Sequence, residues 1–211
     1  MARTEAFDKY LNEYEEWFIV NEYAYKSELE AVRQFIPGNK KGIEIGVGTG
    51  RFSLPFDINE GVEPSSVMRN FAMHKGLEVY NGTAENLPLN DKSYDFALMI
   101  TTICFVDDVL KSFRGINRIL KPEGRLIIGF VDRESPLGTI YQKMKENNKF
   151  YRTATFYSTT ELISYLNKSN FIALEIIQTV FGELPKINKV QSFKTGYGTG
   201  GFVVINAIKI G

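Results

Sequence analysis

Short apolar runs alternate with helical patterns along most of the chain. Seven runs predict strands, at 42–45, 61–63, 77–80, 94–101, 125–131, 171–180 and 202–210. Between them, apolar residues three and four apart predict helices over 65–75 and 106–120. A capping-box pattern, Ser158 to Glu161, opens another helix that reaches about Lys168. Strands that alternate with helices in this way predict a mostly parallel sheet covered by helices on both faces.

Two features precede and follow the first predicted strand. Helical spacing of apolar residues from Phe7 to Ile36 predicts one or two helices, which Pro37 and Gly38 end. After the strand, only ten residues (51–60) separate Gly50 from Gly61. Ten residues are close to the minimum for joining parallel strands, so the helix of this crossover is expected to be short or irregular.

Composition excludes several classes of protein. The 211 residues suit one domain, and 25 Lys plus Arg balance 25 Asp plus Glu, whereas a nucleic-acid binder usually carries a basic surplus. One cysteine and one histidine exclude an internal disulfide and Cys- or His-pair metal sites, so no metal is expected. Residues 1–9 lack the apolar core of a secretory signal, and no run reaches the ~18 residues of a membrane span. We therefore expect a cytoplasmic protein.

The segment after the first strand is rich in glycine. Gly46, Gly48 and Gly50 would let the backbone turn tightly and approach a ligand closely. The pattern differs from the dinucleotide fingerprint, which would need glycine where Arg51 stands, and no Gly-Lys-Ser/Thr of a P-loop follows. The alternative interpretation is a flexible surface loop, which we consider the weaker one.

Two carboxylates flank this loop. Glu63 ends the second predicted strand, where an acidic side chain can accept both hydroxyls of a ribose; the alternative is a solvated strand end. Glu44 stands inside an apolar strand, where a charge is costly unless it is hydrogen-bonded. Two carboxylates disfavour a pyrophosphate ligand and suit a neutral or cationic one.

Five segments occur in the order and spacing of a known family. They are Glu44–Gly50 (EIGVGTG), 61–65 (GVEPS), 81–89 (NGTAENLPL), 94–98 (YDFAL) and 120–126 (LKPEGRL). Over about residues 10–131 the chain resembles class I S-adenosylmethionine-dependent methyltransferases, most closely their small-molecule branch that includes quinone-biosynthesis enzymes. The resemblance implies a Rossmann-like, doubly wound, mostly parallel seven-stranded sheet with an antiparallel last strand. It also implies S-adenosyl-L-methionine as cofactor and methyl transfer to a small-molecule acceptor by in-line displacement.

The resemblance also implies roles for particular residues. Gly46, Gly48 and Gly50 would pack against the methionine and ribose parts of the cofactor, and Glu44 would orient their loop. Glu63 would bind the ribose, Thr83, Ala84 and Glu85 the adenine, and Thr101 the methionine, with Tyr14 and Trp17 covering the site. Relatives often have Asp at position 83 and histidine in the stretch that here reads Ile103-Cys104-Phe105.

No residue is assigned as catalytic, because the cofactor supplies the reactivity and the protein mainly positions the reactants. Tyr10, Tyr14 and Asp107 are weak candidates for a general base. We interpret His74 as a helix-end residue and Cys104 as a small core residue. Basic and aromatic residues interleave over 143–157, either as a nucleic-acid stacking face or as an aromatic substrate lid. Without net positive charge, the lid is the better interpretation.

The expected organisation is one methyltransferase domain, 1–211. It comprises an N-terminal helical cover (1–37), a cofactor-binding half (38–132) and a substrate-side half (133–211). Two alternatives stay open: an RNA or protein methyltransferase, and a catalytically inactive S-adenosylmethionine-binding protein. A nicotinamide dehydrogenase ranks third, because Arg51 replaces the last fingerprint glycine.

Overall fold

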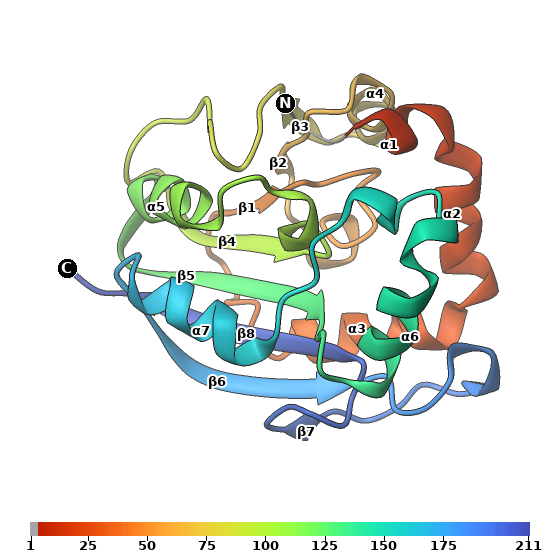
Figure 1. Ribbon diagram of the computed structural model, residues 1–211. Helices are drawn as coiled ribbons and strands as arrows, with labels where there is room; N and C mark the ends of the chain where they lie inside the picture. Colours follow the sequence, from red (N-terminus) through yellow and green to blue (C-terminus); the bar gives the residue numbers. More distant parts are fainter. Residues whose placement is uncertain (1–3) are drawn as a thin grey trace.

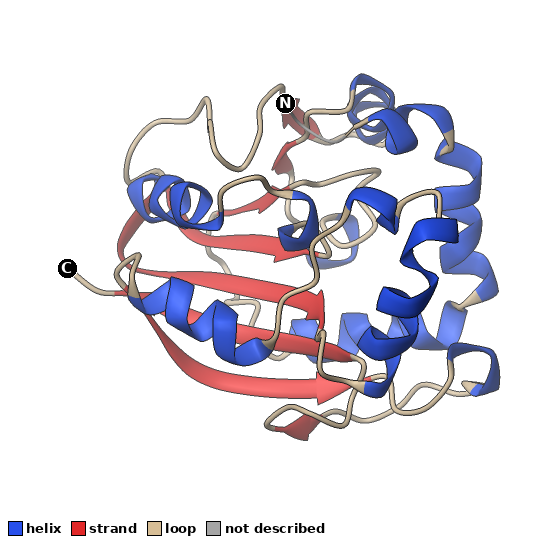
Figure 2. Ribbon diagram, viewed as in Figure 1, coloured by secondary structure: helices blue, strands red, loops and turns tan. Residues whose placement is uncertain are grey.

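The computed structural model describes residues 4–211, which build an eight-stranded sheet with helices on both faces (Figures 1 and 2). The strands are β1 (Gly42–Ile45), β2 (Glu60–Val62), β3 (Glu78–Tyr80), β4 (Tyr94–Ile100), β5 (Leu120–Val131), β6 (Phe171–Thr179), β7 (Lys194–Thr195) and β8 (Phe202–Lys209). Their spatial order is β3-β2-β1-β4-β5-β8-β6-β7. The five neighbouring strands β3, β2, β1, β4 and β5 pair in parallel. Strand β8 lies between β5 and β6 and is antiparallel to both. The predicted Rossmann-like architecture with an antiparallel last strand is confirmed.

The helices are α1 (Glu5–Lys9), α2 (Leu11–Val20), α3 (Glu22–Arg33), α4 (Ser66–His74), α5 (Val109–Ile119), α6 (Pro136–Met144) and α7 (Thr159–Asn167). Strand β4 shows why the sheet is covered twice. Its Ala97 and Met99 pack in a core with α5 and α7, whereas Leu98 and Ile100 pack in a second core with α3. Alternate residues of a strand face opposite sides, so a continuous apolar run is what a sheet between two helical layers requires.

Three details differ from the sequence-based expectations. An eighth strand, β7, was not predicted, because two residues are too few for a pattern. Strand β5 begins at Leu120 instead of Arg125, and the predicted turn at Pro122–Gly124 bulges out of it: pairing with β4 passes from Tyr94–Leu120 directly to Phe96–Arg125. Three helices precede the sheet instead of one or two.

Other local predictions are confirmed. The crossover after β1 holds only a 3-10 turn, Leu54–Phe56. The Ser65 hydroxyl caps α4 by accepting the Met68 N–H at 3.2 Å. Ser158 and Glu161 form the capping box of α7. Among the described residues, no helix is long and apolar enough to cross a membrane.

The sheet topology locates the place for a ligand. Strand order reverses between β1 and β4, and ligands of such sheets lie beyond the carboxyl ends of the strands at that point. In Figure 1, helices α1, α2 and α6 stand beyond the arrowheads of the parallel strands, over this edge.

Candidate functional site

A cavity of about 480 Å³ opens at the carboxyl edge of the sheet. Its floor comes from the segments that follow four strands: Gly46 after β1, Pro64 after β2, Gly82 after β3 and Thr101 after β4. Its cover comes from α1, α2 and residues 147–151. The volume is within the range of sites that enclose a small ligand or cofactor.

The glycine loop forms one wall at close quarters. Gly46 has a φ of +74°, and a Cβ added there would lie 2.4 Å from the Thr102 side chain. The N–H groups of Gly46 and Val47 both donate to the Val62 carbonyl, at 2.8 and 3.1 Å. Gly48 lies beneath the Tyr14 hydroxyl, which would be 3.0 Å from an added Cβ. The loop is thus tied to β2, and at Gly46 and Gly48 it lines the cavity with backbone and no side chain.

Glu63 is held rigidly beside this loop. Its Oε2 accepts the Gly48 N–H at 2.9 Å and its Oε1 accepts the Ser65 N–H at 2.8 Å. The side chain lines the cavity but is only 7% exposed, and this burial raises the pKa of its carboxyl to about 6. Each carboxylate oxygen has a further lone pair, so Glu63 can accept two hydroxyl groups from a ligand.

We expect cofactor affinity to fall with pH below about 6. A ligand whose hydroxyls donate to Glu63 binds the ionised carboxylate and lowers its pKa, so at lower pH binding must release a proton. The Kd of S-adenosylhomocysteine, measured by calorimetry from pH 8 to 5, should rise by up to about tenfold per pH unit below pH 6. Glu63→Ala should remove this dependence. A wild-type Kd that is unchanged between pH 7 and pH 5 would contradict the assignment.

Nine of the eleven residues predicted to bind the cofactor line this one cavity. They are Tyr14, Trp17, Gly46, Gly48, Glu63, Thr83, Ala84, Glu85 and Thr101. Glu44 and Gly50 do not line it. Glu44 is 2% exposed and accepts a hydrogen bond from the Ser53 hydroxyl, and burial raises its pKa to about 8. An influence of Glu44 or Gly50 on the cofactor would therefore act through the shape of the loop.

The segment after β3 has its own restraints. The Asn86 N–H donates to the Thr83 carbonyl at 3.0 Å, which closes a turn around Ala84. The Glu85 carboxylate accepts the Asp107 N–H at 2.7 Å and so ties this turn to the loop before α5. Since that carboxylate has a structural partner, contacts of the turn with a ligand would fall mainly to its backbone and to Ala84.

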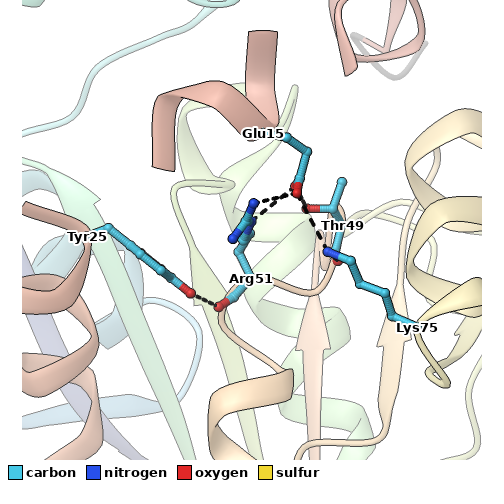
Figure 3. Close-up of polar contacts among 5 residues, drawn as sticks. All are labelled: Glu15, Tyr25, Thr49, Arg51 and Lys75. Carbon is cyan, nitrogen blue, oxygen red and sulfur yellow. Dashed lines mark hydrogen bonds and ion pairs between the residues drawn. The ribbon is translucent and has the colours of Figure 1, made fainter. Parts of the chain in front are cut away.

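A polar cluster fastens the N-terminal helices to the glycine loop (Figure 3). Glu15 of α2 accepts the Thr49 hydroxyl at 2.5 Å and pairs with Arg51 through Nε (3.2 Å) and Nη2 (2.5 Å). Lys75 approaches the same carboxylate at 3.7 Å, and the Tyr25 hydroxyl of α3 donates to the Arg51 carbonyl. In the sequence, Arg51 indicated only that the loop is not a dinucleotide site. In the structure, Arg51 and Thr49 join the N-terminal helices to the glycine loop.

Glu15→Gln is expected to loosen this attachment. Burial alone would raise the pKa of Glu15, but the hydrogen bonds from Arg51 and Thr49 outweigh it and lower the pKa. The contribution of Glu15 to stability is therefore present above pH 4.5 and lost as pH falls through its lowered pKa. A loss of about 1 kcal/mol would lower the Tm by roughly 2–4 °C at pH 7. The exposed neighbour Glu16→Gln is the control, and an equal Tm for both variants would count against the role.

The predicted aromatic lid corresponds to two features. Helix α6 covers 136–144, and Phe150 and Tyr151 of the following turns line the cavity. The Phe150 ring lies 5.5 Å from that of Phe7 and 6.2 Å from that of Tyr14, so this segment meets the N-terminal helices over the site. Lys149 pairs with Glu13 at 3.2 Å. These contacts favour the lid over a nucleic-acid face.

The weaker candidates for a catalytic residue differ in whether they line the cavity. His74 is exposed at the end of α4, with its Nδ1 2.7 Å from the Asn70 carbonyl oxygen, and does not line the cavity. Cys104 is buried against Ala154 and Phe156. Tyr10 lies outside the cavity lining and Asp107 within it. Burial, reinforced by Glu44 and Glu63, raises the pKa of Tyr14 far above its ordinary value, so its hydroxyl is a donor and not a base at neutral pH.

Sequence reasoning did not assign Glu28 of α3 to the site, although it lines the cavity. A signal for it existed. Ala24, Glu28, Ala31 and Val32 follow the spacing of one helix face, and all four are buried. A carboxylate within an apolar stripe is unusual, because burying a charge is costly unless a partner is supplied.

Comparisons with known proteins agree with this geometry. Residues 43–128 match the family model of a methyltransferase domain. The chain is 45% identical to the uncharacterized protein MJ1123 of Methanocaldococcus jannaschii, over 97% of this chain and 98% of that one. A Thermotoga maritima S-adenosylmethionine-dependent methyltransferase of known structure, named a possible histamine N-methyltransferase, is 50% identical with a TM-score of 0.94, over 97% and 98%. Demethylmenaquinone methyltransferase of Staphylococcus aureus is 25% identical, over 74% and 72%.

Proposed function

Since the chain belongs to the class I S-adenosylmethionine-dependent methyltransferases, we propose that it methylates a small molecule held in the aromatic part of its cavity. S-adenosylmethionine is the cofactor of this family, and when bound it supplies a methyl group for in-line displacement from sulfur. The residues of this chain would hold both reactants in line and exclude water, which is where most of the acceleration would arise.

One observation carries the proposal: the same cavity contains both the wall that we propose for the cofactor and an aromatic wall. Gly46, Gly48 and Glu63 lie on the β1–β2 side, and Trp17, Phe52 and Tyr141 line the rest. The cover formed by α1, α2 and Phe150 leaves room for a small acceptor. A folded RNA or protein would have to displace these helices, which Glu15 and Arg51 fasten to the glycine loop.

The residues fit the cofactor in three respects. Glu63 offers two oriented carboxylate oxygens, the glycine loop presents backbone where a Cβ would collide, and the turn around Ala84 borders the same cavity. We propose that these groups bind the ribose, the methionine part and the adenine, respectively, as the sequence suggests. Thr101, which follows β4 with a φ of +51° and lines the cavity, would meet the methionine part.

The relatives support two acceptor classes. The Thermotoga protein, 50% identical, is named for a small nitrogenous acceptor, and this supports a nitrogen atom as the site of methylation. The Staphylococcus enzyme, 25% identical, acts on demethylmenaquinone by its name, and supports a quinone-type ring as the second candidate. The higher identity and coverage favour nitrogen.

Transfer of labelled methyl groups tests the proposal. The purified chain would be incubated with methyl-tritiated S-adenosylmethionine and a cell extract, and the products separated by size. Tritium is expected in the fraction below about 1 kDa and not in protein or RNA. Glu63→Ala would serve as the control for enzyme-dependent label. Label confined to macromolecules would overturn the small-molecule proposal.

A further inference from the structure

The carboxylate of Glu28 has an unusual environment. It lines the cavity from α3, yet the residue is only 5% exposed. Within residues 4–211, no side chain or backbone group forms a hydrogen bond or ion pair with it, and burial alone raises its pKa to about 8. Glu44 is also buried, but it accepts the Ser53 hydroxyl and does not line the cavity. Glu28 therefore lacks the partner that a structural buried carboxylate has, and it faces the space where a ligand would supply one.

The walls around Glu28 suit a cation. Burial, reinforced by the Glu28 charge, raises the pKa of the Tyr141 and Tyr151 hydroxyls, and both residues line the same cavity as Glu28. The two rings lie 5.1 Å apart, and both line the cavity with Trp17. Aromatic faces attract organic cations, most strongly where water is excluded.

The charged residues of the cavity lining also favour a cationic ligand. Its described lining contains five carboxylates, Glu13, Glu28, Glu63, Glu85 and Asp107, against one cationic side chain, Lys149. Lys149 is paired with Glu13 at 3.2 Å. An anionic acceptor would meet no free cationic partner in the described lining, whereas an ammonium group would meet Glu28.

Glu28 also stands on the acceptor side of the site. Helix α3 packs on β5, β6 and β8, on the other side of β4 from the glycine loop and Glu63. The same cavity is lined by Val131, at the end of β5, one of the strands on which α3 packs. A group bound by Glu28 would therefore lie across the cavity from the residues proposed to hold the cofactor.

We propose that Glu28 is the catalytic residue that binds the ammonium group of a primary or secondary amine and removes its proton; this rests on the proposed small-molecule methyltransferase function. An N–H bond of the ammonium breaks, the proton forms an O–H bond on a Glu28 oxygen, and the nitrogen keeps the lone pair. When bound, S-adenosylmethionine supplies the methyl group: the lone pair forms the N–C bond, and the C–S bond breaks with its electrons left on sulfur. Glu28 then releases its proton to water.

Burial strengthens Glu28 as a base. An ordinary carboxylate, with a pKa near 4, is about six pKa units too weak a base for an alkylammonium of pKa about 10. Burial by the protein alone raises the pKa of the Glu28 carboxyl to about 8, and an ammonium group bound beside it favours the ionised form that accepts the proton. The aromatic walls predict that the amine carries a ring or a compact apolar group.

Binding measurements on the full chain, saturated with S-adenosylhomocysteine, test the proposal. The chain contains a single tryptophan, Trp17, which lines the cavity, so its fluorescence reports occupancy. The probes are 2-phenylethylamine and 2-phenylethanol, which differ in ammonium against hydroxyl. The amine is expected to bind at least tenfold more tightly than the alcohol. Glu28→Gln should weaken the amine at least tenfold and leave the alcohol unchanged.

Exposed Glu30→Gln on the same helix is the matched control and should bind like wild type. Glu28→Asp keeps the charge and should retain part of the preference for the amine. No saturable amine binding, or equal binding of both probes by wild type, would overturn the inference, as would an unchanged amine Kd in Glu28→Gln. Failure of S-adenosylhomocysteine to bind would instead remove the proposed function itself, so the two failures are distinguishable.

Discussion

Glu63→Ala should weaken the binding of S-adenosylhomocysteine about a hundredfold. In wild type the carboxylate is fixed by the N–H groups of Gly48 and Ser65, so it would meet the ribose hydroxyls of the cofactor without losing side-chain freedom on binding. Hydrogen bonds to a charged group contribute about 1.5–3 kcal/mol each. Loss of two such bonds, partly offset by water, gives about 2.7 kcal/mol, or two factors of ten in Kd. Isothermal titration calorimetry at pH 7.5 measures it.

A ligand lacking the hydroxyls separates this effect from damage to the loop. Wild type should bind the 2′,3′-dideoxy form of S-adenosylhomocysteine about a hundredfold more weakly than the parent compound. Glu63→Ala should bind the two compounds almost equally, because this variant has already lost the hydrogen bonds to the ribose hydroxyls. Glu60→Ala, at the start of β2, is the control, since Glu60 pairs with Lys41 and accepts the Tyr94 hydroxyl outside the cavity. Additive losses from residue and ligand would show that Glu63 does not contact the ribose.

Much of the fold could be predicted because its signals are local. The apolar run at 94–100 indicates a strand covered on both faces, and β4 has Met99 in one core and Leu98 in the other. Ser65 and Ser158 mark helix starts by bonds within three residues. Strand β7 could not be predicted, because its two residues pair with β6 only through the path of a long loop.

The candidate site likewise has a part that the local sequence predicts and a part that it does not. The glycines and Glu63 belong to one short segment, 46–63, and their spacing could be recognised. The contact between Glu15 and Arg51 joins residues 36 apart on separate elements, and nothing in either local sequence specifies the other. The helical pattern marks Glu28 as unusual but does not reveal its proposed role, because that role depends on which residues of α2, α6 and the turn at Tyr151 line the same cavity.

The N-terminal helices matter for more than cover. Helix α2 supplies Glu15 to the glycine loop and Tyr14 and Trp17 to the cavity, and α3 supplies Glu28. The N-terminal helices therefore cover the proposed cofactor side and also supply residues of the proposed acceptor side. A chain that begins its sheet without these helices would have the cofactor loop but neither the carboxylate nor part of the aromatic wall.

Gly46→Ala is expected to lower both the stability and the cofactor affinity sharply. At a φ of +74°, a residue with a Cβ is destabilised by about 1–2 kcal/mol. The new Cβ would also lie 2.4 Å from Thr102, and overpacking of this kind costs about 1–3 kcal/mol. Together, about 3 kcal/mol should lower the Tm by roughly 6–12 °C. Thermal unfolding followed by circular dichroism measures the shift, and calorimetry the loss of S-adenosylhomocysteine binding.

Two other glycines resolve the causes of that loss. Gly76→Ala has a φ of +97° and no atom within 4 Å of the added Cβ, so it reports backbone strain alone. Gly38→Ala has open space and no such φ, and should change the Tm little. Thr102→Ala in the Gly46→Ala background removes Oγ1 and Cγ2, the two nearest colliding atoms, but leaves the Cβ at 2.9 Å. It should therefore recover most of the collision part, though not the strain. If Gly46→Ala and Gly76→Ala lower the Tm equally, backbone strain alone explains the loss, and the predicted collision with Thr102 is contradicted.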